Sequence, residues 1–454
     1  MMMTRNLVAA AFAAMQFAAL AAGPFEDAVL HGETDKARAI DYAPGEEMTF
    51  TLTLQGAEDF GKGEYFVQWT RTGDDGQTDK GRIDAKALPL VVKTKTDKPG
   101  FVRLEACVVD KKGVAYKKSF KGDPNTPEGK KALNAFERKD KRVFFDGGAG
   151  VQPEKLQSVP EPKDFDEFWA KRRARLAKVP LEAERKETPC DRKDVKVYAV
   201  SIKCAGARPS TGWLTVPVKP GKYPISVSFH GYGHSYPNKG HVVTPIHGDG
   251  RTIWFNFSPH GYELGREPEY YDEFYRSICS GGCTFGFDPK SNADPETCYF
   301  SGYTYRIMRA LEWLKTLPEW NGRDLRVGGG SMGGMQSMWA AGLDPDVSEA
   351  KPSIPWNCDM GGRDTLKRII NPWYIRETPA LRYYDPVNLA KRVSPKCRVE
   401  ITRAGLGDYC CPPSGVSVLY NNLKCPKKIN WVQGSTHGYV PPEEHQHFTQ
   451  EKDW

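Results

Sequence analysis

Residues 325–334 read Leu-Arg-Val-Gly-Gly-Gly-Ser-Met-Gly-Gly, and this stretch decides the fold. A short apolar strand runs into Gly-x-Ser-x-Gly, and a helix is predicted directly after it. A serine at such a turn is typical of a nucleophile elbow, in which glycines leave room for the backbone to close around the serine. We therefore expect Ser331 to be a nucleophile, with Gly329 and Gly333 lining the turn. The amide of Met332 would then act as an oxyanion donor at the positive end of a helix.

The same glycines allow a second interpretation, because Gly328, Gly330 and Gly333 also match the G-x-G-x-x-G fingerprint of dinucleotide-binding proteins. That fingerprint requires an acidic residue about 20 positions further on, which holds the ribose. Residues 351–356 (KPSIPW) contain none, and the nearest acid that follows is Asp359. The elbow is therefore the favoured interpretation, and a tight glycine turn without a function is a third alternative.

The sequence around the elbow alternates between predicted strands and helices. The clearest helix runs from Gly302 to Leu317, where apolar residues recur at helical spacing until Pro318. Another helix is predicted from Glu167 to Lys178. This alternation predicts a mostly parallel sheet with helices on both faces. The predicted strands are Val195 to Ser201, Gly212 to Val216, Ile225 to Phe229, Thr252 to Phe257, Leu325 to Gly328, Arg398 to Thr402 and Ile429 to Val432.

An acid and a histidine follow two of these strands in the order that catalysis by a serine requires. Asp408 comes after the strand from Arg398, and His437 comes after the last strand. The order Ser, Asp, His is that of α/β-hydrolases, in which loops at the carboxyl ends of the strands bring the three together. A serine hydroxyl needs an imidazole to take its proton, and the imidazole needs a carboxylate on its far nitrogen. Each of the two also has a structural interpretation, Asp408 as a turn residue and His437 as a loop histidine.

The segment from Ile225 to Tyr232 is a buried strand that ends in His-Gly. In α/β-hydrolases the loop after this strand supplies the second oxyanion amide, so Tyr232 is the candidate donor. His230 is expected to be structural. Four histidines gather here, but they lack the helical His-x-x-x-His spacing of zinc sites, so no metal and no organic cofactor are expected. These histidines are His230, His234, His241 and His247.

The amino-terminal third has a different pattern, in which short alternating segments are separated by turn formers. The predicted strands are Met48 to Leu54, Tyr65 to Thr70, Pro89 to Lys93 and Phe101 to Val109. Such segments pack best as a small β-sandwich of the immunoglobulin-like type. Residues 125–150 are rich in Lys, Gly and Pro and are predicted to be a linker or a long surface connection. The expected domains are residues 1–22, 23–150 and 151–454.

Residues 1–22 have the features of a secretory signal peptide: Arg5 near the start, an apolar stretch from Leu7 to Leu20, and small residues at the exit. The apolar stretch is too short to serve as a membrane anchor. We therefore expect export to the periplasm or the exterior. Export would allow some of the eleven cysteines to pair, and Cys279, Cys283 and Cys298 are candidates for a loop staple.

Composition excludes other classes of protein. The chain of 454 residues has 39% hydrophobic residues, which is ample for buried cores. Its formal charge of +7 is spread over many short clusters rather than one basic stripe, so no nucleic-acid partner is expected. Whether copies of the chain form a homo-oligomer is left open.

From about Pro160 to its end the chain resembles the acetylxylan esterase and cephalosporin-C deacetylase family of α/β-hydrolases. The resemblance implies that Ser331, Asp408 and His437 form the triad. It also implies that the backbone amides of Tyr232 and Met332 form the oxyanion hole. The motifs that carry it are residues 164–169 (DFDEFW), 329–334 (GGSMGG), 405–414 (GLGDYCCPPS) and 436–438 (THG).

Two departures from the family pattern concern the substrate side. The family usually has Gln after the nucleophile, where this chain has Met332, but the expected donor there is the main-chain amide. The family's Arg-Gly-Gln motif is replaced by residues 258–261 (SPHG), as in exported relatives that carry a β-sandwich before the hydrolase domain. His260 and Trp356 are therefore the candidate substrate contacts.

The expected function is that of an exported serine esterase that removes acetyl groups from acetylated polysaccharides or oligosaccharides by an acyl-enzyme mechanism. One alternative is a general carboxylesterase or a peptidase on the same fold, which the fold alone does not exclude. The other alternative is a carbohydrate-binding protein whose hydrolase domain is inactive. The sandwich is expected to supply no catalytic group.

Overall fold

The computed structural model describes residues 25–57, 64–137, 140–233, 242–441 and 446–454. The predicted signal peptide lies outside these residues, and so do His234 and His241. Within the described ranges, no helix combines the length and the apolar character that crossing a bilayer demands.

The amino-terminal strands form a β-sandwich, as the alternating pattern predicts. One sheet has the order β1-β2-β5 and the other the order β4-β3-β6-β7. A hydrophobic core of its own lies between them, built around residues such as Phe50, Val67 and Leu104. The strands are β1 (Val29–Thr34), β2 (Met48–Gln55), β3 (Tyr65–Gly73), β4 (Asp79–Asp84), β5 (Leu90–Thr94), β6 (Gly100–Asp110) and β7 (Phe144–Val151).

The prediction of a linker over residues 125–150 is wrong for most of that segment. Helix α1 (Pro127–Glu137) is followed by β7, which pairs antiparallel with β6 along its whole length. The glycines that suggested a linker are required by close contacts instead. A Cβ on Gly148 would lie 2.6 Å from the carbonyl oxygen of Val102, so no larger residue fits there.

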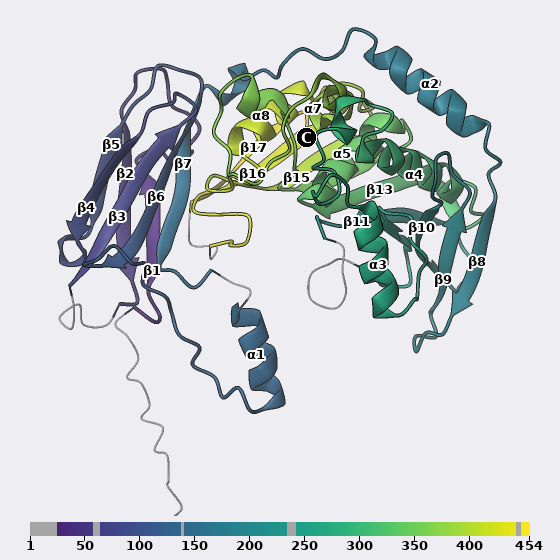
Figure 1. The fold of residues 1–454 in the computed structure, drawn as a ribbon, viewed down its shortest axis with the longest axis horizontal. Coiled ribbons are helices and arrows are strands. Elements are labelled where there is room, and N and C mark those ends of the chain that lie inside the picture. The colour runs from purple at the N-terminus through teal and green to yellow at the C-terminus, as the bar shows by residue number, and fades with distance from the viewer. Residues whose placement is uncertain (1–24, 58–63, 138–139, 234–241, 442–445) are drawn as a thin grey trace, which may run out of the picture.

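The rest of the chain forms a ten-stranded sheet in the order β17-β16-β15-β14-β13-β11-β12-β10-β9-β8. The pairs between β12 and β16 are parallel, and the outer pairs are antiparallel. Helices flank this sheet (Figure 1), which gives the α/β-hydrolase arrangement that the alternating pattern predicts. The strands are β8 (Ala183–Thr188), β9 (Val195–Ile202), β10 (Ser210–Pro217), β11 (Tyr223–Phe229), β12 (Ile253–Ser258), β13 (Trp320–Gly330), β14 (Glu349–Ser353), β15 (Arg398–Gly405), β16 (Lys427–Val432) and β17 (His447–Lys452). The helices after α1 are α2 (Phe165–Ala177), α3 (Pro268–Ile278), α4 (Tyr299–Leu314), α5 (Met332–Leu343), α6 (Gly361–Asp364), α7 (Pro386–Ala390) and α8 (Pro413–Asn422).

The sandwich packs against the end of the large sheet that carries β15 to β17 (Figure 1). The side chain of Gln433, in the loop after β16, forms two hydrogen bonds with the backbone of Gly148. Gly148 N donates to Gln433 Oε1 at 2.9 Å, and Gln433 Nε2 donates to Gly148 O at 2.9 Å. A second close contact involves Gly407, in the loop after β15, because a Cβ on this residue would lie 1.9 Å from the carbonyl oxygen of Asp146. Strand β7 therefore touches the loops after both β15 and β16.

The Arg103 side chain adds a charged contact to this interface. Its guanidinium forms a paired ion bridge with Asp146, with hydrogen bonds of 2.9 and 2.6 Å. It also lies over the ring of Tyr409, 4.3 Å from the ring centroid. The sandwich and the hydrolase sheet are thus joined by buried, directional contacts.

We predict that Gln433→Ala destabilises the protein by about 1–3 kcal/mol, because it leaves the buried N–H and C=O of Gly148 without partners. Urea denaturation measures this loss. Gln77→Ala, which truncates an exposed glutamine in the sandwich, is the matched control and should be within about 0.5 kcal/mol of the wild type. Equal stability of the Gln433 variant and the wild type would contradict the importance of this contact.

Candidate active site

Ser331 lies at the turn between β13 and α5 in a strained backbone conformation. Its φ of 57° and ψ of −120° are sparsely populated by residues with a side chain. Ser331 N donates to Ser353 O at 2.9 Å, and Trp356 N donates to Ser331 O at 3.0 Å. A Cβ on either Gly329 or Gly333 would lie 2.3 Å from the carbonyl oxygen of Phe229, so the expectation that these glycines make room for the turn is confirmed.

These contacts disfavour the dinucleotide interpretation of the same glycines. The next strand, β14, ends at Ser353, and the carbonyl oxygen of Ser353 accepts the hydrogen bond from Ser331 N. The end of this strand therefore holds the Ser331 turn and does not carry the acid that a ribose would require. The first acid after that strand is Asp359. The turn is therefore organised around the serine.

Asp408 and His437 meet at the carboxyl ends of β15 and β16. His437 Nδ1 lies 3.0 Å from Asp408 Oδ2. The carboxylate is fully buried, whereas 37% of the His437 side chain is exposed. The other carboxylate oxygen, Oδ1, accepts the amides of Cys410 and Cys411 at 3.1 and 3.0 Å. The two loops are joined directly as well, because Gly407 N donates to Ser435 O at 3.0 Å.

The electrostatics of this pair favour a positive imidazole. Burial by itself lowers the pKa of His437, but hydrogen bonds and charge interactions with Asp408 and Cys410 outweigh burial and raise it above its ordinary value. Hydrogen bonds to Cys411 and His437 hold the pKa of the Cys410 thiol below its ordinary value. A raised pKa makes the neutral imidazole a stronger base, but the imidazolium must lose its proton before it can act as one.

Ser331 belongs to the same edge of the sheet, because β13, β14, β15 and β16 are parallel neighbours whose carboxyl ends lie together. In the part of the chain that the structure describes, the Ser331 hydroxyl forms no hydrogen bond with His437. Catalytic hydrogen bonds often tighten only when the substrate is bound. The structure thus brings Asp408 and His437 into contact and places Ser331 on the adjoining loop.

The two candidate oxyanion amides lie on neighbouring turns. Strands β11 and β13 are parallel, with Phe229 paired to Gly329, so Tyr232 and Met332 each follow a paired residue by three positions. Gln336 Nε2 links the turns by donating to His230 O at 2.9 Å and to Met332 O at 3.2 Å.

His230 itself has a structural role, as expected. Its Nε2 lies 2.6 Å from Asn256 Oδ1, which connects the loop to β12.

His260, predicted to contact a substrate, is buried in this structure, and its role toward a substrate stays a prediction. Its side chain is only 2% exposed, with Nδ1 lying 2.8 Å from the Tyr299 hydroxyl and Nε2 lying 3.3 Å from Gly233 O. Because Gly233 follows Tyr232, this histidine supports the loop that carries a candidate oxyanion amide.

Trp356 is also buried, with 1% of its surface exposed. Its indole stacks on Trp373, with ring centroids 5.1 Å apart, and Trp373 also meets the ring of Tyr232 edge to face. Trp373 is 39% exposed and lies between solvent and these two candidate residues. Trp373 was not predicted from the sequence, although its position after Asn-Pro in a polar loop is a visible signal.

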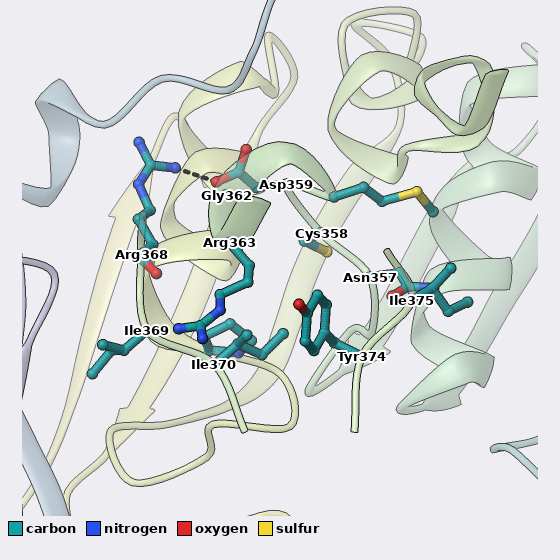
Figure 2. Close-up of a pocket in the computed structure, with 14 residues that line it drawn as sticks. Asn357, Cys358, Asp359, Gly362, Arg363, Arg368, Ile369, Ile370, Tyr374 and Ile375 are labelled. Atoms are coloured by element: carbon teal, nitrogen blue, oxygen red, sulfur yellow. Dashed lines mark hydrogen bonds and ion pairs between the residues drawn. The ribbon is translucent and has the colours of Figure 1, made fainter. Parts of the chain in front are cut away.

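A small cavity of about 30 Å³ lies behind these loops, and Figure 2 shows the side chains that line it. Asp359 and Arg368 form an ion pair at its wall. Burial raises the pKa of Asp359 to about 7, although Arg368 lowers it. The cavity has room for a water molecule but not for a sugar, and none of Ser331, Asp408 or His437 lines it.

All eleven cysteines lie among the described residues, and none is in a disulfide, so the predicted staple of Cys279, Cys283 and Cys298 is not formed. Within the described ranges, one group of residues brings three potential metal ligands together: Cys410, Cys411 and His437. Their ligand atoms lie within 4.8 Å of one another.

This chain is similar to known esterases in sequence and in fold. The acetyl xylan esterase family model matches residues 154–452. Acetyl esterase Axe7A of Xylanibacter ruminicola is 30% identical over 317 residues, which cover 64% of this chain and 68% of that protein. The crystal structure of acetyl xylan esterase 1 from Thermoanaerobacterium sp. JW/SL YS485 aligns with a TM-score of 0.51 at 22% identity. That alignment covers 64% of this chain and 94% of that chain.

The family model spans more than half of the chain and includes the Ser331 turn, the Asp408 loop and the His437 loop. The solved structure supports the α/β-hydrolase fold. This chain belongs to the acetyl xylan esterase family of carboxylic ester hydrolases.

Proposed function

We propose that this protein removes acetyl groups from acetylated polysaccharides or oligosaccharides through an acyl-enzyme. Ser331 is the nucleophile, His437 the general base, and Asp408 the carboxylate that orients the histidine. The observation that carries the proposal is the buried Asp408 carboxylate bonded to His437 Nδ1, on loops at the same sheet edge as the strained Ser331 turn.

The first step is attack on the acetyl carbonyl. His437 Nε2 takes the proton of Ser331 while Asp408 stabilises the imidazolium that forms. The oxyanion accepts hydrogen bonds from the backbone amides of Tyr232 and Met332. Met332 is the first residue of α5, where an N–H has no partner within the helix and faces the positive end of the helix dipole.

The second step releases the products. The imidazolium of His437 gives its proton to the leaving sugar alcohol, and water then attacks the acetyl-serine with the same histidine as base. No metal ion takes part in these steps, because the nucleophile, the base and the oxyanion donors are all groups of the protein.

The substrate class is proposed from family membership and from the relative that is named an acetyl esterase. The predicted signal peptide, residues 1–22, is the basis for proposing that the protein acts outside the cytoplasm, in the periplasm or beyond. We also propose the domain boundaries 23–150 and 151–454, with the sandwich as a scaffold for the catalytic loops. A general esterase or peptidase on the same fold is the alternative that the acyl-chain series below tests.

We predict that Ser331→Ala lowers the turnover of 4-nitrophenyl acetate by about a million-fold, because it removes the nucleophile. Alanine also has a Cβ, so the backbone strain at this turn is unchanged. Stability by urea denaturation should stay close to that of the wild type. Ser277→Ala, on the exposed face of α3, is the matched control and should hydrolyse the ester at the wild-type rate. Wild-type activity of the Ser331 variant would show that the nucleophile lies elsewhere.

A second prediction concerns pH. The neutral form of His437 acts as base, so kcat/KM should rise with pH through the pKa of His437, which Asp408 raises. Asp408→Asn removes that charge and should move the rise to lower pH, while turnover falls by about 10⁴-fold.

The pH profile of kcat/KM for 4-nitrophenyl acetate measures this shift. The control Asp249→Asn changes an acid paired with Arg251 on an exposed loop and should leave the profile unchanged. A rise that stays at the same pH in Asp408→Asn would mean that this carboxylate does not act on the base.

The third prediction separates acetyl specificity from general esterase action. Each added methylene offers about 0.8 kcal/mol of burial if it fits, but overpacking a rigid site costs about 1–3 kcal/mol. Met332 and Trp356 are buried beside Ser331 and are the proposed walls of the acyl pocket. The specificity constant over 4-nitrophenyl esters from acetyl to octanoyl should therefore be greatest for acetyl. A maximum at butyryl or beyond would favour the general esterase.

A further inference from the structure

Two thiols accompany the catalytic histidine, and the proposed esterase mechanism uses neither of them. Cys410 and Cys411 follow Asp408 after one intervening residue, Tyr409, and both cysteines are buried. The Sγ of Cys411 lies 3.8 Å from His437 Nδ1. The two sulfurs and an imidazole nitrogen all lie within 4.8 Å of one another. Such a set of ligand atoms is a coordination site as well as a part of the catalytic loop.

We propose that Cys410, Cys411 and His437 bind a thiophilic divalent cation, such as Zn²⁺ or Cd²⁺, and that this binding switches the esterase off. The inhibitory part of the proposal rests on the proposed role of His437 as general base. The binding part depends only on the three ligands.

The ligand chemistry selects the class of cation. Thiolate and imidazole ligands favour soft or borderline ions over Mg²⁺ and Ca²⁺, which prefer oxygen. Two cysteines and one histidine, with a position left for water, form a known tetrahedral zinc set. With zinc–sulfur bonds of about 2.3 Å, two ligand sulfurs lie about 3.8 Å apart, so small side-chain shifts bring these atoms to bonding distance.

The loop is already fixed in the shape that the site needs. The amides of Cys410 and Cys411 both donate to Asp408 Oδ1, which holds the two cysteines on one turn. The bond from Gly407 N to Ser435 O keeps this turn beside the His437 loop. The partly exposed imidazole gives a cation from solvent a way to the buried thiols.

Binding at Nδ1 would disable the histidine through its tautomer. In the esterase, Nδ1 carries a proton toward Asp408, and the lone pair of Nε2 accepts the serine proton. A cation that binds the Nδ1 lone pair requires the imidazole proton to move to Nε2, which then has no lone pair for Ser331. The two thiols lose their protons to solvent on binding, and no group is oxidised or reduced. Asp408 keeps its two amide donors when it loses the histidine.

The test uses the whole chain, kept reduced with a phosphine, and titrates it with Cd²⁺. Binding is followed by the ultraviolet absorbance of thiolate–Cd²⁺ bonds, and activity by hydrolysis of 4-nitrophenyl acetate. We expect one Cd²⁺ per chain to appear in the absorbance as hydrolysis falls at least about tenfold, with full recovery after a chelator is added. Cys410→Ser keeps the backbone amide to Asp408, and its inhibition is measured relative to its own metal-free hydrolysis. It should require at least about tenfold more Cd²⁺ for half-inhibition, because one of three ligands is lost.

The matched control is Cys190→Ser. The Cys190 Sγ lies 3.5 Å from His247 Nδ1, so this is a second cysteine–histidine pair outside the site. Replacing Cys190 should change neither the Cd²⁺ concentration that gives half-inhibition nor the number of Cd²⁺ ions bound per chain as hydrolysis falls. Equal inhibition of Cys410→Ser and the wild type would overturn the proposal, and so would thiolate binding at Cys410 without inhibition. The absorbance reports on the site even if Ser331→Ala shows that the proposed mechanism is wrong, so the two failures are distinguishable.

Discussion

The close approach of Phe229 to the Ser331 turn is the constraint on which the candidate active site depends. Its carbonyl oxygen occupies the space that a Cβ on Gly329 or Gly333 would take. Strands β11 and β13 pair in parallel up to Phe229 and Gly329, and only glycine fits beside Phe229 O at the start of the turn. The hydrogen bonds from Ser331 N to Ser353 and from Trp356 N to Ser331 then tie the turn to β14. The strain at Ser331 persists because these neighbours leave no other conformation.

A second constraint comes from outside the hydrolase sheet. Strand β7 of the sandwich lies against the loops of both Asp408 and His437, through Gly407 and Gln433. In α/β-hydrolases these loops carry chemistry, and loops are normally the least restrained parts of a fold. Here a glycine-rich strand from another part of the chain restrains them. The sandwich thus contributes no catalytic group to the proposed mechanism but restrains the loops that carry two of the proposed catalytic side chains.

Much of this architecture could be predicted from local patterns. The strands around Val227 and Val327 were recognised because buried parallel strands are continuous apolar runs bounded by turn formers. The order of Ser331, Asp408 and His437 along the chain, each after a strand, predicted which loops meet. Strand β7 was missed because its glycines lack the side-chain alternation that identifies a strand. The reason for these glycines lies in close contacts with residues that are distant in sequence. Val102 lies on the neighbouring strand of the same sheet, and Gln433 lies in a loop of the large sheet.

The sequence by itself determined the elbow, the acid and histidine that follow later strands, and the presence of a sandwich. These features depend on residue type and short-range spacing, which a single chain displays directly. Only the tertiary structure decided that His260 is a buried support, that Trp373 covers Trp356, and that Cys410 and Cys411 lie against His437. The physical reason is that burial and ligand distance depend on how loops from different strands pack together. A loop residue has the same local sequence whether its side chain faces solvent, a neighbouring ring or a catalytic histidine.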